Sequence, residues 1–144
     1  MASKERVLKL TIMQRRNPAM TEEQFHAHWT SKHAPLASSW LQRNGIIGYA
    51  QYHTPKSTRD LAAGVAKEFG WTLSDYDGHV EFMVRSVKDL KKAIQDPEYP
   101  EKVLPDEQRF MDQSNSLVTV GWEEVYVKDR KVVNIDRNGN SVYS

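Results

Sequence analysis

The order of the patterned segments constrains the fold of this chain more than any other feature. Four segments alternate apolar with polar residues, as strands with one buried face do. They span residues 7–16, 45–53, 79–85 and 117–127. Helical periodicity over residues 21–43 separates the first strand from the second, and periodicity over 86–95 separates the third strand from the fourth. A weaker helical stretch covers 57–69, between the second and third strands. This order predicts an α+β, ferredoxin-like fold, in which a four-stranded antiparallel sheet carries helices on one face.

Local signals mark where the two main helices begin and end. Thr21 and Gln24 fit a capping box, and Ser86 fits an N-cap. Pro35 predicts that the first helix ends or kinks near Ala34, because proline disfavours a helical conformation in the residue before it. The segment 36–43 is expected to resume as one or two helical turns.

The second and third strands are expected to contribute a pocket on the face of the sheet that the helices leave bare. Gly48 and Ala50 share one face of the second strand, and small residues suit close packing under a helix. The other face is therefore expected to look away from the helices, together with the polar face of the third strand. A mixture of aromatic, amide, imidazole, carboxylate and thioether side chains is typical of a semi-polar pocket. Its expected residues are Tyr49, Gln51, His53, His79, Glu81 and Met83.

Composition removes several kinds of chemistry. The chain has 144 residues and no cysteine, which excludes a disulfide scaffold, a thiolate nucleophile and an iron–sulfur cluster. A net charge of +1 argues against nucleic-acid binding, and no apolar run approaches the ~18 residues of a membrane span. No secretory leader is recognisable, so a cytoplasmic protein is expected. The lean hydrophobic content of 39% favours a homodimer, in which a second subunit adds burial.

Five histidines are the groups that titrate near neutral pH. On an ideal helix, His26 and His28 point about 200° apart and His26 and His33 lie two turns apart, so no metal site is expected. On the third strand, His79 alternates with Glu81, and a neighbouring carboxylate would set the tautomer and the pKa of the imidazole.

The first helix carries the motif Thr21-x-x-Gln24-Phe25-His26-x-His28-Trp29-x-x-x-His33-Ala34-Pro35-Leu36, which resembles that of EthD-domain proteins. Further landmarks resemble that family in the same order: Tyr76-Asp77-Gly78, Glu81, Asp96-Pro97 and Asp106-Glu107-x-x-Phe110. The likeness covers about residues 7–127. We therefore expect an EthD-like domain over 1–127 and a C-terminal extension over 128–144, which forms a hairpin or an arm that grips a partner subunit.

The resemblance implies a dimeric α/β barrel, in which two sheets face each other and each protomer holds a pocket. Within the family, the chain is similar to small fungal proteins of aromatic polyketide clusters that are described as decarboxylases or dehydratases. The implied activity is a cofactor-independent lyase, and the implied substrate is an aromatic polyketide carboxylic acid of the anthrone or atrochrysone type. A dehydratase, a cyclase, a haem- or O₂-using barrel and a non-catalytic polyketide-binding dimer remain alternatives. The strand Gly78-His79-Val80-Glu81 also resembles that of plant olivetolic-acid-cyclase-like barrels, which implies a catalytic His79.

The expected mechanism is decarboxylation, in which the keto tautomer accepts the electron pair and a histidine protonates carbon. His79 or His33 would deliver the proton, and Glu81 or Asp77 would orient the imidazole ring. Phenolic oxygens would be bound by Tyr49, Gln51 and His53. The other expected substrate-binding residues are Trp29, Phe25, His28, Met83, Tyr76 and Phe110.

Overall fold

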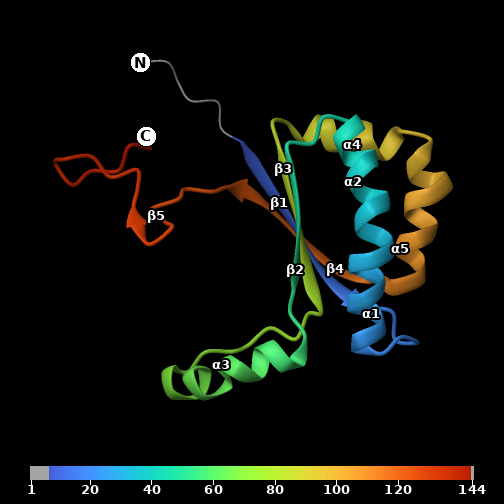
Figure 1. The fold of residues 1–144 in the computed structure, drawn as a ribbon, viewed down its shortest axis with the longest axis horizontal. Coiled ribbons are helices and arrows are strands. Elements are labelled where there is room, and N and C mark those ends of the chain that lie inside the picture. The colour runs from blue at the N-terminus through green and yellow to red at the C-terminus, as the bar shows by residue number, and fades with distance from the viewer. Residues whose placement is uncertain (1–6, 144) are drawn as a thin grey trace.

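The computed structural model describes residues 7–143 and has the predicted α+β, ferredoxin-like architecture (Figure 1). One antiparallel sheet has the strand order β2-β3-β1-β4. Its strands are β1 (Leu8–Arg16), β2 (Gly48–His53), β3 (Gly78–Val84) and β4 (Met111–Trp122). β4 begins earlier than the sequence predicts, because it follows the preceding helix without a loop, and it also ends earlier, at Trp122.

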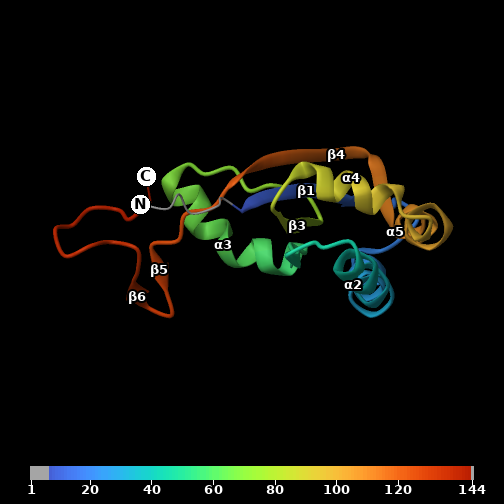
Figure 2. The same ribbon diagram turned by 90° about the horizontal axis from the view of Figure 1, so that it is seen from above.

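Two interrupted helical rods cover one face of the sheet (Figures 1 and 2). The first rod consists of α1 (Glu22–His28), the π turn η1 (Trp29–His33) and α2 (Ala34–Arg43). The second consists of α4 (Val87–Gln95), the π turn η2 (Tyr99–Val103) and α5 (Leu104–Phe110). The helix α3 (Lys56–Phe69) lies on the opposite side of the sheet, near the end of β2.

The predicted helix caps are confirmed. The Thr21 side chain accepts a hydrogen bond from the Gln24 backbone, and the Gln24 side chain accepts one from the Thr21 backbone. The Ser86 hydroxyl accepts from the Lys88 N–H at the start of α4. α3 ends at Gly70, whose φ of 70° places it in the left-handed region that favours glycine. These short-range signals therefore set where the helices start and stop.

Each rod continues through a proline by means of its π turn. The Ala34 N–H donates to the Trp29 carbonyl, five residues earlier, and Pro35 follows directly. Leu104 and Pro105 repeat this arrangement after η2. Proline has no N–H and would clash with the carbonyl four residues before it in an α-helix, whereas the wider turn shifts the hydrogen-bond register. The first helix is therefore interrupted just before Ala34 and resumes as α2, as Pro35 predicts, but the π turn that carries it past the proline is not part of the prediction.

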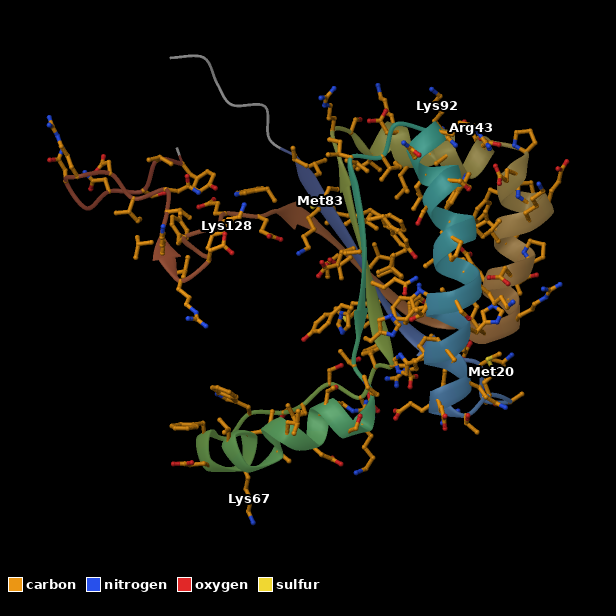
Figure 3. All side chains as sticks on the ribbon, viewed as in Figure 1. Met20, Arg43, Lys67, Met83, Lys92 and Lys128 are labelled. Carbon is orange, nitrogen blue, oxygen red and sulfur yellow. The ribbon has the colours of Figure 1, made fainter. Side chains whose placement is uncertain are left out.

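The expected composition of the bare face is wrong for β2. Tyr49, Gln51 and His53 pair directly with Phe82, Val80 and Gly78, so they share the face that the helices cover. The β3 residues of the expected pocket, namely His79, Glu81 and Met83, lie on the other face, as Figure 3 shows for Met83. One set of expected pocket residues is thus divided between two faces of the sheet.

The reason is that the close helix contact falls on β3 and not on β2. A Cβ atom at Gly78 would lie 2.4 Å from Cζ3 of Trp29, so the indole packs directly against this backbone. Gly48 instead faces the side chain of Met83 on the open face. The glycine that permits helix packing is therefore Gly78, and the aromatic and polar residues of β2 share the interior with the helices.

The segment after β4 stands away from the sheet, on the same side as α3 (Figure 1). It contains the short hairpin of β5 (Val127–Lys128) and β6 (Lys131–Val132). The Asn134 side chain donates to the Val125 carbonyl and to the Tyr143 hydroxyl, which ties the segment to itself. Within residues 7–143, no helix combines the length and the apolar character that a membrane crossing needs.

Candidate active site

The π turn η1 brings two histidines onto one carboxylate. His28 Nε2 lies 2.9 Å from Asp106 Oδ1, and His33 Nδ1 lies 2.8 Å from Asp106 Oδ2. Residues five apart lie about 140° apart on an α-helix, but a π turn places them nearly above one another. Asp106 follows Pro105 in the second rod and is only 7% exposed. The two rods are therefore joined through a buried His–Asp–His cluster.

The geometry of His33 is that of an oriented general base. Its side chain is buried, with 4% of the residue exposed, and the Asp106 carboxylate accepts from Nδ1. Nε2 is then the unprotonated nitrogen, and it makes no hydrogen bond within the described part of the chain. Burial lowers the pKa of His33, although Asp106 opposes this effect. The imidazole is therefore neutral near pH 7 and able to accept a proton.

A cavity of about 30 Å³ lies between the sheet and the two rods. Four polar residues line it, which are Gln14, His33, Tyr49 and Glu107. The remaining wall is mostly apolar and consists of Ile12, Ala37, Trp40, Leu41, Val80, Phe82 and Met111. This volume suits a water molecule. The cavity is therefore the inner end of a site, and a larger ligand has to extend beyond it.

Glu107 adds an acid to the same cavity. Its Oε2 accepts hydrogen bonds from the Tyr99 hydroxyl at 3.0 Å and from Gln113 Nε2 at 2.8 Å. Burial raises the pKa of Glu107 to about 7. A carboxyl group with this pKa is protonated in a large fraction of molecules at neutral pH and can donate a proton. A neutral imidazole and a carboxylic acid therefore line one cavity.

The polar residues of β2 form a hydrogen-bonded chain and do not all reach the cavity. His26 Nδ1 lies 2.7 Å from His53 Nδ1, and His53 Nε2 lies 2.9 Å from Gln51 Oε1. Gln51 Nε2 donates to the Tyr49 hydroxyl at 2.9 Å and to the Trp29 carbonyl at 3.1 Å. Gln51 and His53 were expected to bind phenolic oxygens, but their polar atoms are already engaged. Of these four hydrogen-bonded residues, only Tyr49 lines the cavity.

The aromatic residues expected to bind substrate rings are core residues in this structure. Phe25, Trp29 and Phe110 have no exposed surface. The Phe110 ring centroid lies 4.9 Å from those of both His28 and His33, so it packs against the histidine cluster. These residues support the site from behind, and none of them lines the cavity.

The expected site residues around His79 are engaged elsewhere. Glu81 forms an ion pair with Lys9 at 3.4 Å, and the His79 ring packs against Tyr52 with centroids 5.3 Å apart. Burial lowers the pKa of His79. Because β3 alternates its side chains, His79 and the cavity lie on opposite faces of the sheet.

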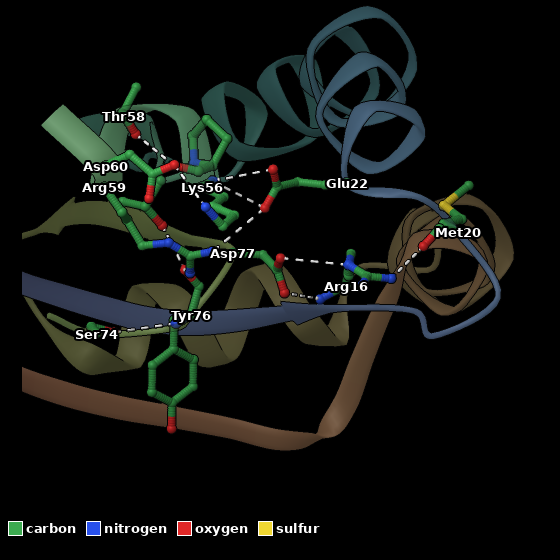
Figure 4. Close-up of polar contacts among 12 residues, drawn as sticks. Arg16, Met20, Glu22, Lys56, Thr58, Arg59, Asp60, Ser74, Tyr76 and Asp77 are labelled. Atoms are coloured by element: carbon green, nitrogen blue, oxygen red, sulfur yellow. Dashed lines mark hydrogen bonds and ion pairs between the residues drawn. The ribbon is translucent and has the colours of Figure 1, made fainter. Parts of the chain in front are cut away.

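Asp77 has a structural set of partners. Its Oδ2 accepts from the Arg16 N–H at 2.8 Å, and the Arg16 guanidinium lies against its other oxygen, as Figure 4 shows. Tyr76 lies under the Arg15 guanidinium, which is 4.1 Å from the ring centroid. Asp77 therefore ties the end of β1 to the loop before β3. The carboxylate that orients an imidazole beside the cavity is Asp106.

Asp106, Glu107 and Gln14 are site residues that the sequence reasoning missed. Asp106-Glu107 was recognised only as a family landmark. A usable signal was the repeated proline after each helical stretch, at Pro35 and Pro105, which accompanies both π turns. A wheel drawn with that wider turn places His28 and His33 together.

Comparisons with known proteins agree with this fold. The model of the EthD domain matches residues 17–114. Over 129 residues the chain is 36% identical to the conidial pigment biosynthesis dehydratase EthD of Metarhizium robertsii, covering 90% of this chain and 91% of that protein. Over 128 residues it is 32% identical to the decarboxylase claH of Passalora fulva, covering 89% and 83%.

Solved structures share the fold at low sequence identity. An EthD-like protein from Ralstonia eutropha has a TM-score of 0.57 at 15% identity, covering 88% of this chain and all of that one. A dimeric ferredoxin-like protein from Thermobifida fusca has a TM-score of 0.51 at 10% identity, covering 85% and 96%. The family model and the similarity to fungal relatives along most of their length lead to one conclusion: this chain belongs to the EthD domain family.

Proposed function

We propose that this protein is a cofactor-independent lyase that acts on a small aromatic polyketide. The observation that carries the proposal is the pairing of a neutral base, His33, with a protonatable acid, Glu107, on one buried cavity. Relatives named dehydratase and decarboxylase support a lyase, and one of them belongs to pigment biosynthesis. The family resemblance supports an aromatic polyketide as the substrate class.

Dehydration of a β-hydroxy ketone uses both groups directly. His33 Nε2 takes the proton from the carbon next to the carbonyl, and an enolate forms. The enolate electrons then make the carbon–carbon double bond as the carbon–oxygen bond breaks, and Glu107 protonates the departing hydroxyl to give water. The cycle closes when the proton held by His33 returns to Glu107. Asp106 stabilises the imidazolium that exists between these steps.

Decarboxylation, which the sequence reasoning places first, is the second candidate. The specific observation in its favour is that no lysine or arginine lines this cavity in the described part of the chain. A substrate carboxylate that loses its hydration without gaining a cation is primed to release CO₂. The bond electrons pass to the neighbouring carbonyl, and Glu107 delivers its proton to carbon and then takes up another from water.

We propose that the ring system of the substrate lies along the inner face of β4. Val118, Val120 and Trp122 pair with the buried face of β1, so they lie on the same side of the sheet as the cavity. All three are about half exposed. Ile12, which lines the cavity, pairs directly with Val118. A flat apolar molecule that covers this stripe would extend its reacting carbon toward the cavity.

We further propose that the protein is a homodimer formed through the open face of the sheet. α3 projects on that side and exposes three apolar residues at successive turns, namely Leu61, Val65 and Phe69. Leu61 is 84% exposed and Phe69 is 63% exposed. The segment after β4 projects on the same side and exposes Val127, which directly precedes the C-terminal extension, and Val132 within the extension. A second copy would bury both segments, which gives the extension its expected role as an arm.

The test is an assay with atrochrysone carboxylic acid, in which loss of water and loss of CO₂ are distinguished by product mass. His33→Gln should lower kcat by about 10²–10⁴-fold, because the base is lost. His79→Gln, on the opposite face of the sheet, is the matched control and should retain activity. The reverse pattern would place the chemistry on the open face and refute the proposal.

A further inference from the structure

The chain of His26, His53, Gln51 and Tyr49 runs from the outer surface to the cavity. His26 lines a groove between α1 and the start of α3 that also contains Glu22, Pro55 and Ser57. Tyr49 lines the cavity at the other end. The three links between these residues measure 2.7, 2.9 and 2.9 Å. A continuous set of short hydrogen bonds therefore joins the outer groove to the buried cavity.

The Trp29 carbonyl determines the orientation of the Gln51 amide. A backbone carbonyl only accepts hydrogen bonds, so the Gln51 atom 3.1 Å from it is the NH₂ nitrogen. The second hydrogen of that nitrogen is then directed to the Tyr49 hydroxyl oxygen. The amide oxygen Oε1 consequently faces His53, and the two ends of the amide cannot be exchanged without losing the bond to Trp29.

The amide in turn determines both histidine tautomers. Gln51 Oε1 accepts, so His53 Nε2 carries a hydrogen. Burial, together with the neighbouring His26, lowers the pKa of His53 and keeps it neutral, so its Nδ1 is an acceptor. His26 Nδ1 must then be the donor of the bond between the two rings. His26 Nε2 is then left as a buried acceptor, and it makes no hydrogen bond in the described residues.

Every donor in the chain therefore points toward the cavity. His26 donates to His53, His53 donates to Gln51, and Gln51 donates to Tyr49. The Tyr49 oxygen is already an acceptor, and its own hydrogen has no acceptor among the described residues. Burial raises the pKa of Tyr49, so the hydroxyl keeps its proton at neutral pH.

We infer that Tyr49 is a catalytic hydrogen-bond donor to the oxyanion of the substrate, and that His26, His53 and Gln51 are positioning residues that fix the direction of its proton. The inference rests on the proposed function, because an enolate oxygen forms in both candidate reactions. A donor aimed at a developing oxyanion stabilises the transition state more than the ground state. No proton is transferred along the chain in this role.

The decisive variant is Gln51→Glu. A carboxylate at this position has the shape of the amide but only accepts hydrogen bonds, so the Tyr49 hydroxyl would turn to it and away from the cavity. We expect kcat to fall by about 10²-fold, as it does when an oxyanion donor is removed. Tyr49→Phe should cause the same loss, because it removes the donating hydroxyl. The ring that stacks on Phe82 is retained, so the variant tests the hydroxyl alone. Gln42→Glu, which adds the same charge on an exposed turn of α2, should leave kcat unchanged.

Nitrogen NMR of the labelled protein tests the chain without any substrate. The wild type should show neutral His53 protonated on Nε2 and neutral His26 protonated on Nδ1. In Gln51→Glu, His53 should become doubly protonated near neutral pH, because it then faces a carboxylate. His53 protonated on Nδ1 in the wild type would overturn the inference, whether or not the protein is active.

The two measurements separate the inference from the function it rests on. The expected tautomers in a protein that converts no polyketide would refute the proposed function and leave the direction of the chain intact. Activity with full kcat in Tyr49→Phe would refute the catalytic donor and leave the lyase assignment intact. A normal amide NMR spectrum of each variant shows that it is folded.

Discussion

At the scale of single residues, Glu107 should make the stability of the protein depend on pH. Its pKa is raised from 4.5 to about 7 in the folded state. As pH rises from about 4.5 to 7, the unfolded chain loses the proton first, so the folded state loses stability across this window. Glu107→Gln removes that titration. The variant should gain roughly 1–2 kcal/mol relative to the wild type across the window, after allowance for partial solvent exposure.

Urea unfolding at about pH 4.5 and about pH 8 measures this difference. Glu101→Gln, an exposed residue of the same rod, is the control and should follow the wild-type pH dependence. If the free energies of unfolding of the wild type and Glu107→Gln change in parallel between these two pH values, Glu107 titrates normally in the folded protein.

The contact partners of single site residues were the hardest feature to predict from the sequence. His33 was predicted as a site residue, and the structure places it beside the cavity. Its expected carboxylate partners are Glu81, on the third strand, and Asp77, in the turn just before that strand. The partner is Asp106, 73 residues further along the chain. Contacts over that separation depend on how two helical rods pack, and no local pattern encodes this.

At the scale of elements, the capping box should make a measurable contribution to stability. Thr21→Ala removes the side-chain bond to the Gln24 N–H at the start of α1. The free energy of unfolding should fall by about 1 kcal/mol, which is the typical cost of losing such a cap. Thr72→Ala, in an exposed loop, is the control. Equal denaturant midpoints for the two variants would show that the rod does not depend on its cap.

Elements with local signals were predicted well, and elements shaped by packing were not. The order of strands and helices, the Thr21 and Ser86 caps and the end of α4 at Gln95 are confirmed. The π turns were missed, because a proline in sequence indicates an interruption without showing whether the chain bends or widens. The face of β2 was assigned wrongly because small residues can lie under a helix or under a neighbouring side chain.

At the scale of the whole molecule, the exposed apolar face of α3 predicts self-association. Leu61→Glu combined with Phe69→Glu should convert the proposed dimer to a monomer, since two charges would have to be buried at the contact. Ala63→Glu adds a charge to the opposite side of the same helix and should leave the dimer intact. Sedimentation equilibrium gives the mass of each variant. A wild-type mass of one protomer would refute the dimer itself.

The fold class and the existence of a bare sheet face followed from the sequence, because both depend on the order of elements. The location of the cavity did not follow, since it depends on which face of β2 the helices cover. The reacting groups of the proposed mechanism, His33 and Glu107, line the same cavity of one chain, and the hydrogen-bonded series from His26 to Tyr49 is also formed within that chain.

This placement of both reacting groups on one chain has a consequence for mixed assemblies of the proposed dimer. If an inactive His33→Gln subunit pairs with a normal one, the normal subunit keeps a complete set of reacting groups. Activity should then fall in simple proportion to the inactive fraction, and the inactive allele should be recessive in a cell that carries both. Two variants defective in different cavity residues should likewise fail to restore each other when they are mixed.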